Sequence, residues 1–146
     1  MLTIRHIKPS DTYHLRHTIL RPNQSIEDCM YKGDEDDSTI HLGAFWEGKL
    51  ISIGTFMQVS HPDLGGDFPY QLRGMATDPN YRRQKAGSTL MAHAESLLKE
   101  NNCDLLWCNA RYNVKDYYAH MGFQEHGDIF EIEPIGLHVV MFKNLD

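Results

Sequence analysis

Cationic side chains gather directly before an amphipathic stretch of this sequence. Arg82, Arg83 and Lys85 lie close together, and the small residues Ala86 and Gly87 follow. The first turn of a helix carries unpaired backbone N–H groups and about half a positive charge, so it attracts phosphate. The cations strengthen that field, and small residues let the backbone approach a bulky anion. The stretch therefore predicts a phosphate-binding loop, with a solvated basic surface as the alternative.

The position of this loop favours ligand binding. Leu90, Met91, Ala94, Leu97 and Leu98 recur at helical spacing, which predicts a helix packed on a sheet. A strand over residues 68–77 precedes it, so the basic loop lies where a strand leads into a crossover helix, the usual ligand site of open α/β sheets. The sequence contains neither GxxxxGK[ST] nor GxGxxG, which excludes the common nucleotide loops.

Further patterns predict the elements that position this loop. A first strand covers residues 2–7, and Pro9 opens a helix that Pro22 ends. One helical turn is expected over residues 26–31. Alternating apolar residues predict further strands, in ranges 40–46, 50–59, 103–111, 123–132 and 138–143. The near-continuous apolar run 103–111 is typical of a strand buried on both faces, so it should pair in parallel with the strand around Gln71. A short helix over residues 114–121 ends at Gly122.

Two stretches carry a resemblance to a known family. LRGMATDPNYRRQKAGSTLMAHAE and ARYNVKDYYAHMGF resemble the GCN5-related N-acetyltransferase family, whose coenzyme signature is Q/R-x-x-G-x-G/A. Arg82, Ala86 and Gly87 fall in or beside that signature. The family's Y-x-x-x-G-F element is matched by Tyr118, Gly122 and Phe123, and the closing GLHVVMFKNL is similar to the end of small bacterial members.

The resemblance implies the fold. It is an α/β (α+β) fold with a central mixed, mainly antiparallel sheet of about six or seven strands and about four flanking helices. A V-shaped opening separates the two parallel central strands. Residues 1–146 are expected to form a single N-acetyltransferase domain of this type.

The resemblance also implies roles for particular residues. Tyr118 would be the general acid that protonates the sulfur of coenzyme A. Asn113 and Arg111, which lie near the predicted coenzyme cleft, would hydrogen-bond the pantetheine. Backbone N–H groups from Met75, Ala76 and Thr77 would bind the thioester and pantetheine arm. The pyrophosphate would lie on the loop formed by Arg82, Arg83, Gln84, Lys85, Ala86, Gly87 and Ser88.

Some of these assignments have alternatives. Lys85 stands at the first motif glycine, and it is expected to keep its N–H on the pyrophosphate with a negative φ, because positive φ is costly for a residue with a Cβ. An aromatic on a short helix is often a core residue, and Tyr117 is predicted to be that core aromatic. A helix cap would also explain Asn113. The general base is left open between Glu131, His138 and an ordered water.

The function implied is acetyl-CoA-dependent N-acetylation. Acetyl-CoA would be the co-substrate, and its acetyl group would pass directly, in a ternary complex, to a primary amine of a small molecule or peptide. The rival is a non-catalytic acyl-CoA sensor or interaction domain that keeps the pocket. A third interpretation, nucleic-acid binding through the basic loop, conflicts with 20 acidic against 14 basic residues and a formal net charge of -6.

Composition limits the remaining partners. The 146 residues contain no apolar run long enough to span a membrane and no signal-peptide pattern at the N-terminus, so a cytoplasmic protein without membrane contact is expected. The three cysteines follow no metal-ligand spacing and are predicted to be reduced, and the nine histidines form no recognisable triad, so no metal is expected. Acidic residues 34–37 form no calcium loop; a weaker hypothesis is that they attract a cationic amine. The amine acceptor and a homodimeric state are left open.

Overall fold

The computed structural model describes residues 1–145, and a seven-stranded sheet runs through them in the order β1-β2-β3-β4-β5-β7-β6. Neighbouring strands are antiparallel except β4 and β5, which are parallel. The strands are β1 Leu2–His6, β2 Ile40–Trp46, β3 Lys49–Met57, β4 Pro69–Thr77, β5 Leu105–Arg111, β6 Gln124–Ile132 and β7 Gly136–Asn144. The mixed, mainly antiparallel sheet expected from the sequence is confirmed.

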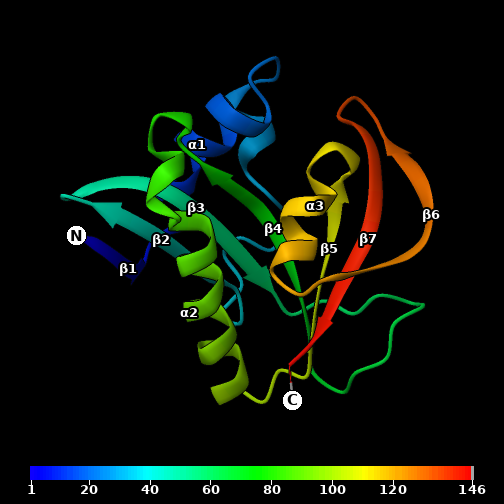
Figure 1. Cartoon of the computed structure of the whole chain (residues 1–146). Helices are drawn as coiled ribbons and strands as arrows, with labels where there is room; N and C mark the ends of the chain where they lie inside the picture. The colour runs from blue at the N-terminus through cyan, green and yellow to red at the C-terminus, as the bar shows by residue number, and fades with distance from the viewer. Residues whose placement is uncertain (146) are drawn as a thin grey trace.

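Helices cover both faces of this sheet (Figure 1). α2 (Ala86–Glu100) and α3 (Lys115–His120) lie on one face, and α1 (Tyr13–Leu15) lies behind it. Short helical segments join them, namely η1 Pro9–Thr12, η2 Arg16–Leu20, η3 Ile26–Cys29, η4 Pro79–Gln84 and η5 Tyr112–Val114. The helix expected between Pro9 and Pro22 is present but divided into 3-10, α and π segments. Thr12 and Thr18 donate to carbonyls of the preceding turn, and such bonds compete with regular helical bonding.

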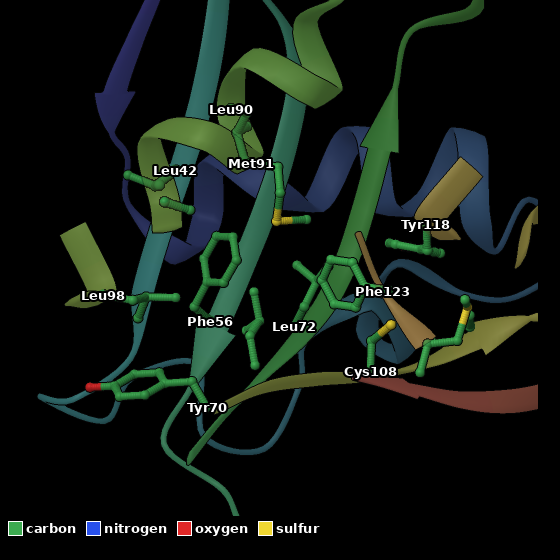
Figure 2. Close-up of a cluster of buried hydrophobic side chains, with 14 of the residues drawn as sticks. Leu42, Phe56, Tyr70, Leu72, Leu90, Met91, Leu98, Cys108, Tyr118 and Phe123 are labelled. Atoms are coloured by element: carbon green, nitrogen blue, oxygen red, sulfur yellow. The ribbon is translucent and has the colours of Figure 1, made fainter. Parts of the chain in front are cut away.

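The apolar stripe of α2 forms one side of the main core. Leu90, Met91 and Leu98 are almost fully buried, and Figure 2 shows them around Leu42 and Phe56 of the sheet. Fully burying each such side chain contributes roughly 1.5–3 kcal/mol. The packing fixes α2 against β2 and β3, and so fixes where its N-terminus opens.

β4 and β5 separate soon after they meet. Their parallel register covers only Pro69–Gln71 against Leu105–Trp107, and Figure 1 shows them diverging toward their carboxyl ends. A bulge in β4 accompanies the divergence: Gly74 has φ +62°, and the register with β3 shifts at this point. A Cβ on Gly74 would lie 3.0 Å from Nε of Arg16, so the position needs glycine for space as well as conformation. The V-shaped opening is confirmed.

A buried ion pair supports the bulge from behind. Arg16 and Asp34 are 0% and 4% exposed, and Nη1 of Arg16 lies 2.7 Å from Oδ2 of Asp34 while Nη2 lies 3.0 Å from Oδ1. Arg16 also donates to the Cys29 carbonyl and to the Thr55 hydroxyl, both at 2.8 Å. Its guanidinium stacks on Tyr31, with Cζ 3.8 Å from the ring centroid. The pair thus ties η2 and the segment before β2 to β3.

Replacing Asp34 by asparagine should destabilise the protein. The Asp34→Asn variant leaves the Arg16 charge buried without its counterion, which typically costs about 3–5 kcal/mol. Urea unfolding followed by circular dichroism would measure the loss. Asp37→Asn, an exposed change in the same segment, is the matched control and should stay within about 0.5 kcal/mol of the parent protein. Equal stability of the two variants would show that the ion pair contributes nothing.

Candidate functional site

A cavity of about 830 Å³ occupies the opening between β4 and β5. Residues from the start of α2 and from α3 line it, as do Tyr31 and residues of η2 on the opposite side of the sheet. The opening therefore passes between the two covered faces. Two ligands that enter from opposite sides would meet beside β4.

The N-terminus of α2 faces this cavity as the sequence predicts. Arg82, Lys85, Ala86, Gly87 and Ser88 all line it. The helix has no side-chain N-cap, so the first backbone N–H groups have no side-chain partner at this end. Such a terminus presents aligned donors and a positive dipole to an anion. The geometry is that of a phosphate site.

Lys85 differs from the expectation on its backbone. It adopts φ +57° and ψ 33°, the left-handed conformation, so the prediction of a negative φ was wrong. The turn from η4 into α2 requires this geometry, and a non-glycine residue there costs about 1–2 kcal/mol. The carbonyl of Lys85 accepts from Ser88 Oγ at 3.1 Å, Thr89 N at 3.0 Å and Thr89 Oγ1 at 2.9 Å. These bonds hold the strained residue in place.

Only some of the other residues predicted to bind the coenzyme line the cavity. Met75, Ala76 and Thr77 line it, and the β4 edge that carries them has no β5 partner beyond Gln71. Backbone groups on this edge are available to a ligand. By contrast, Arg83 and Gln84 are not among the lining residues, although they flank Arg82 and Lys85.

Both tyrosines of α3 line the cavity, and Tyr118 rather than Tyr117 is the buried one. Tyr117, predicted to be the core aromatic, is 42% exposed, and that prediction was wrong. A Cβ on Gly87 would collide with the Tyr117 hydroxyl, which therefore lies against the phosphate loop. Tyr118 is 9% exposed and packs edge-on against Phe123, yet it also lines the cavity (Figure 2). Adjacent residues on a helix point about 100° apart, so only one of the pair can face the sheet.

Burial controls the ionisation of the Tyr118 hydroxyl. Desolvation raises the pKa of Tyr118 well above 10, and the neighbouring Cys108 and Tyr117 raise it further. The phenol is therefore protonated at neutral pH. Within residues 1–145 no protein group hydrogen-bonds this hydroxyl, so a proton there is not committed to an acceptor in the protein.

Two candidate bases are placed differently. His138 on β7 is buried and lines the cavity, and its Nδ1 lies 2.7 Å from the Gly136 carbonyl. A carbonyl only accepts, so Nδ1 carries a proton, and in the neutral imidazole the lone pair is then on Nε2. Glu131 is exposed on β6 and does not line the cavity. Asn113 lines the cavity and caps neither η5 nor α3, so the alternative role as a helix cap was wrong.

Acidic side chains are absent from the cavity wall formed by residues 1–145. Asp34 is held by Arg16, and none of residues 34–37 lines the cavity, so the structure does not bring the acidic loop to this site. In the same part of the chain, no His, Cys, Asp and Glu side chains are grouped to hold a metal ion. No helix up to residue 145 is long and apolar enough to cross a membrane.

Two arginines of the cavity wall have a larger place in the structure than sequence reasoning assigned. Arg73 on β4 is not identified by any sequence motif, and Arg111 on β5, expected with Asn113 to contact the pantetheine, also lines the cavity. A charged residue in the middle of a partly buried strand, directly before the Gly74 bulge, is the signal that identifies Arg73.

Comparison with known proteins gives one family and one fold. The model of the acetyltransferase (GNAT) family matches residues 4–123. The chain is 52% identical over 145 residues to the Bacillus subtilis (strain 168) protein named uncharacterized N-acetyltransferase YitI, covering 99% of this chain and 97% of that protein.

Solved structures share the fold at low sequence identity. A crystal structure of the ribosomal-protein-S18-alanine N-acetyltransferase from Escherichia coli matches with a TM-score of 0.76 and 19% identity, over 99% of this chain and 94% of that one. An aminoglycoside 6'-N-acetyltransferase complexed with coenzyme A matches with a TM-score of 0.75 and 10% identity, over 99% and 97%.

Lys85→Gly should stabilise the protein. Glycine relieves the strain of the left-handed conformation, which is about 1–2 kcal/mol. Its greater freedom in the unfolded state opposes this by about 0.4–1 kcal/mol, so a net gain in the free energy of unfolding of roughly 0.5–1 kcal/mol is expected. Chemical denaturation would measure it. Glu47→Gly is the control, because Glu47 also has a positive φ, of 49°, but lies in the β2–β3 turn away from the cavity. A loss of stability in Lys85→Gly beside a gain in Glu47→Gly would contradict the strain argument.

Proposed function

Because the chain belongs to the acetyltransferase (GNAT) family, we propose that it is an acetyl-CoA-dependent N-acetyltransferase that acetylates a primary amine directly in a ternary complex. The observation that carries the proposal is the cavity between β4 and β5, with the uncapped N-terminus of α2 on one side and η2 on the other. A thioester and an amine entering from these sides would meet at the β4 bulge. In this proposal residues 1–146 form one acetyltransferase domain.

The phosphate loop and β4 would hold the coenzyme. Backbone N–H groups at the start of α2 would bind the pyrophosphate, with Arg82 and Lys85 adding charge-assisted contacts. The free β4 edge from Met75 to Thr77 would hydrogen-bond the pantetheine arm and the thioester carbonyl, and Asn113 would contact the arm from the other wall. Donors aimed at that carbonyl would stabilise the negative charge that develops on its oxygen.

The proposed transfer conserves atoms and charge. An ammonium acceptor first loses one proton to become a nucleophilic amine, which then attacks the thioester carbonyl. The C–N bond forms, the C–S bond breaks, and the amide nitrogen loses a second proton while the departing thiolate gains one. The sum is an ammonium and acetyl-CoA giving an acetamide, coenzyme A as the thiol, and one proton released to solvent.

Tyr118 would donate a proton to the thiolate, and His138 would accept one from the amine. Burial keeps Tyr118 protonated, and the same dry surroundings raise the proton affinity of a departing thiolate. His138, with the Nε2 lone pair left free, would accept a proton from the amine directly or through one water. Its place on the cavity wall favours it over the exposed Glu131.

Removing the Tyr118 hydroxyl separates turnover from binding. Tyr118→Phe should lower kcat about 100-fold or more, the usual range for a lost general acid, and leave the Kd for coenzyme A unchanged. Thiol release from acetyl-CoA with a panel of amines and calorimetry with coenzyme A measure the two quantities. Tyr70→Phe removes another buried hydroxyl whose pKa burial raises, outside the cavity, and it controls for stability. A parent protein that binds acetyl-CoA and acetylates no amine would be the sensor instead.

Adjacent arginines test the phosphate loop. Arg82→Gln should raise the Kd for coenzyme A about tenfold or more at low salt, because a charge-assisted contact is typically worth about 1.5–3 kcal/mol. Arg83→Gln removes the same charge from a side chain off the cavity wall and should have a much smaller effect. Calorimetry at two salt concentrations measures both. Equal losses would mean that only the summed charge of the loop acts.

A further inference from the structure

The acceptor side of the cavity carries positive charge without a matching acid. Arg73, Arg16 and Arg21 surround the ring of Tyr31, with their Cζ atoms 4.3, 3.8 and 5.1 Å from its centroid. Of the three, Arg73 lines the cavity together with Tyr31. Arg111 reaches the same region, where it donates to the Leu20 carbonyl at 2.6 Å.

Asp34, the carboxylate that opposes the lowering of the Arg73 pKa, is already held by other groups. Asp34 is held by both terminal nitrogens of Arg16 and by the backbone N–H of Tyr31. Within residues 1–145 the Arg73 guanidinium has no ion pair and no hydrogen bond to the protein. Burial lowers the pKa of Arg73, and the neighbouring Arg21 and Arg16 lower it further, while Tyr31 and Asp34 oppose the change. Arg73 is therefore a partly buried cation that stacks on Tyr31 and has no carboxylate partner within residues 1–145.

The coenzyme pyrophosphate would not lie where Arg73 could bind it. Side chains alternate along a strand: Leu72 packs in the core beneath α2, and Arg73 points to the opposite face, where it meets Tyr31. The phosphate loop lies at the start of α2, on the Leu72 side. Arg73 is instead adjacent to Gly74, where the bulge opens, and the apolar Ile19 and Leu20 complete this side of the wall.

We propose that the acceptor amine itself carries a carboxylate, which Arg73 binds with support from Arg111, and that the substrate class is amino acids or similar amino carboxylates. This rests on the proposed transferase function and names its acceptor. A planar guanidinium binds a carboxylate through two parallel hydrogen bonds, and an acid-free cavity disfavours polycationic amines. The free amine of the bound amino acid attacks the thioester carbonyl; the C–N bond forms, the C–S bond breaks, His138 takes the amine proton and Tyr118 protonates the thiolate.

Matched acceptors test the charge requirement. The protein amino acids are each compared with their amides, phosphoethanolamine with ethanolamine, and spermidine and kanamycin serve as polycations. Thiol release from acetyl-CoA should show kcat/KM for the preferred amino acid about tenfold or more above that of its amide, mainly through KM. Faster turnover of amides or polycations would overturn the proposal. An Arg73-dependent preference for phosphoethanolamine would replace the carboxylate by a phosphate.

Variants of Arg73 assign the effect to this side chain. Arg73→Gln should bring the amino acid down to the level of its amide, with a loss for the acid at least about tenfold larger than any change in the amide rate or in the Kd for coenzyme A. Arg73→Lys should recover part of the loss, because it restores the charge but not the paired hydrogen bonds. Arg5→Gln is the control: Arg5 also stacks on an aromatic ring, with Cζ 4.4 Å from the Phe45 centroid, but lies on β1 away from the cavity. Equal losses for acid and amide in Arg73→Gln would reveal a structural role and overturn the proposal.

Binding without turnover separates this inference from the proposed function. The preferred amino acid and its amide are titrated into protein saturated with coenzyme A, and Arg73→Gln is measured beside the parent. Acid-selective binding that Arg73→Gln abolishes supports the carboxylate site, and if no amine releases thiol in the same preparation, only the transferase proposal fails. Turnover of amines with no acid-selective binding overturns the carboxylate site alone.

Discussion

The separation of β4 from β5 is the constraint on which the other features depend. A parallel pair of strands normally satisfies its backbone groups along its whole length, but here the register stops at Gln71 and Trp107. Beyond that point the β4 edge must find other partners, since unpaired backbone groups are costly away from water. The left-handed Gly74 turns the strand, and the resulting gap is wide enough for a cavity of about 830 Å³. A sheet without the bulge would close the site.

The bulge is held open by structure that does no chemistry. Arg16 and Tyr31 lie against Gly74, and Arg16 is fixed by Asp34, Thr55 and a backbone carbonyl. Nε of Arg16 is itself buried without a partner, so this arrangement is not optimised for stability alone. Well-packed apolar residues of similar volume in place of the ion pair would often give equal or greater stability. The ion pair of Arg16 and Asp34 instead holds η2, η3 and β3 together around the opening. It also places Tyr31 against Arg73.

Local patterns predicted most of the strands and helices, and the family resemblance supplied their arrangement in the sheet, while side-chain contacts between distant segments were not predictable. The period-two runs and the α2 stripe gave strands and helices close to their observed bounds, because each pattern reflects burial on one face. The left-handed Lys85 depends on how η4 enters α2, and the exposure of Tyr117 depends on how α3 packs on the sheet. The phosphate loop was visible because its charge is continuous in sequence. Arg73 was not, because its surroundings come from η2, Arg21, Tyr31 and Asp34, which lie far from β4 in the sequence.

Charge in the cavity bears on reactivity as well as on recognition. A chain with a formal net charge of -6 builds a cavity wall without acids, lined by Arg73 and Arg111 on one side and Arg82 and Lys85 on the other. Cations near an amine disfavour its protonated form and lower its pKa, and only the neutral amine is a nucleophile. The same cations would repel an acceptor that enters as an ammonium. A carboxylate on the acceptor supplies the attraction that the ammonium lacks. The same field that would repel a polyamine then binds the acid and helps to free the amine lone pair.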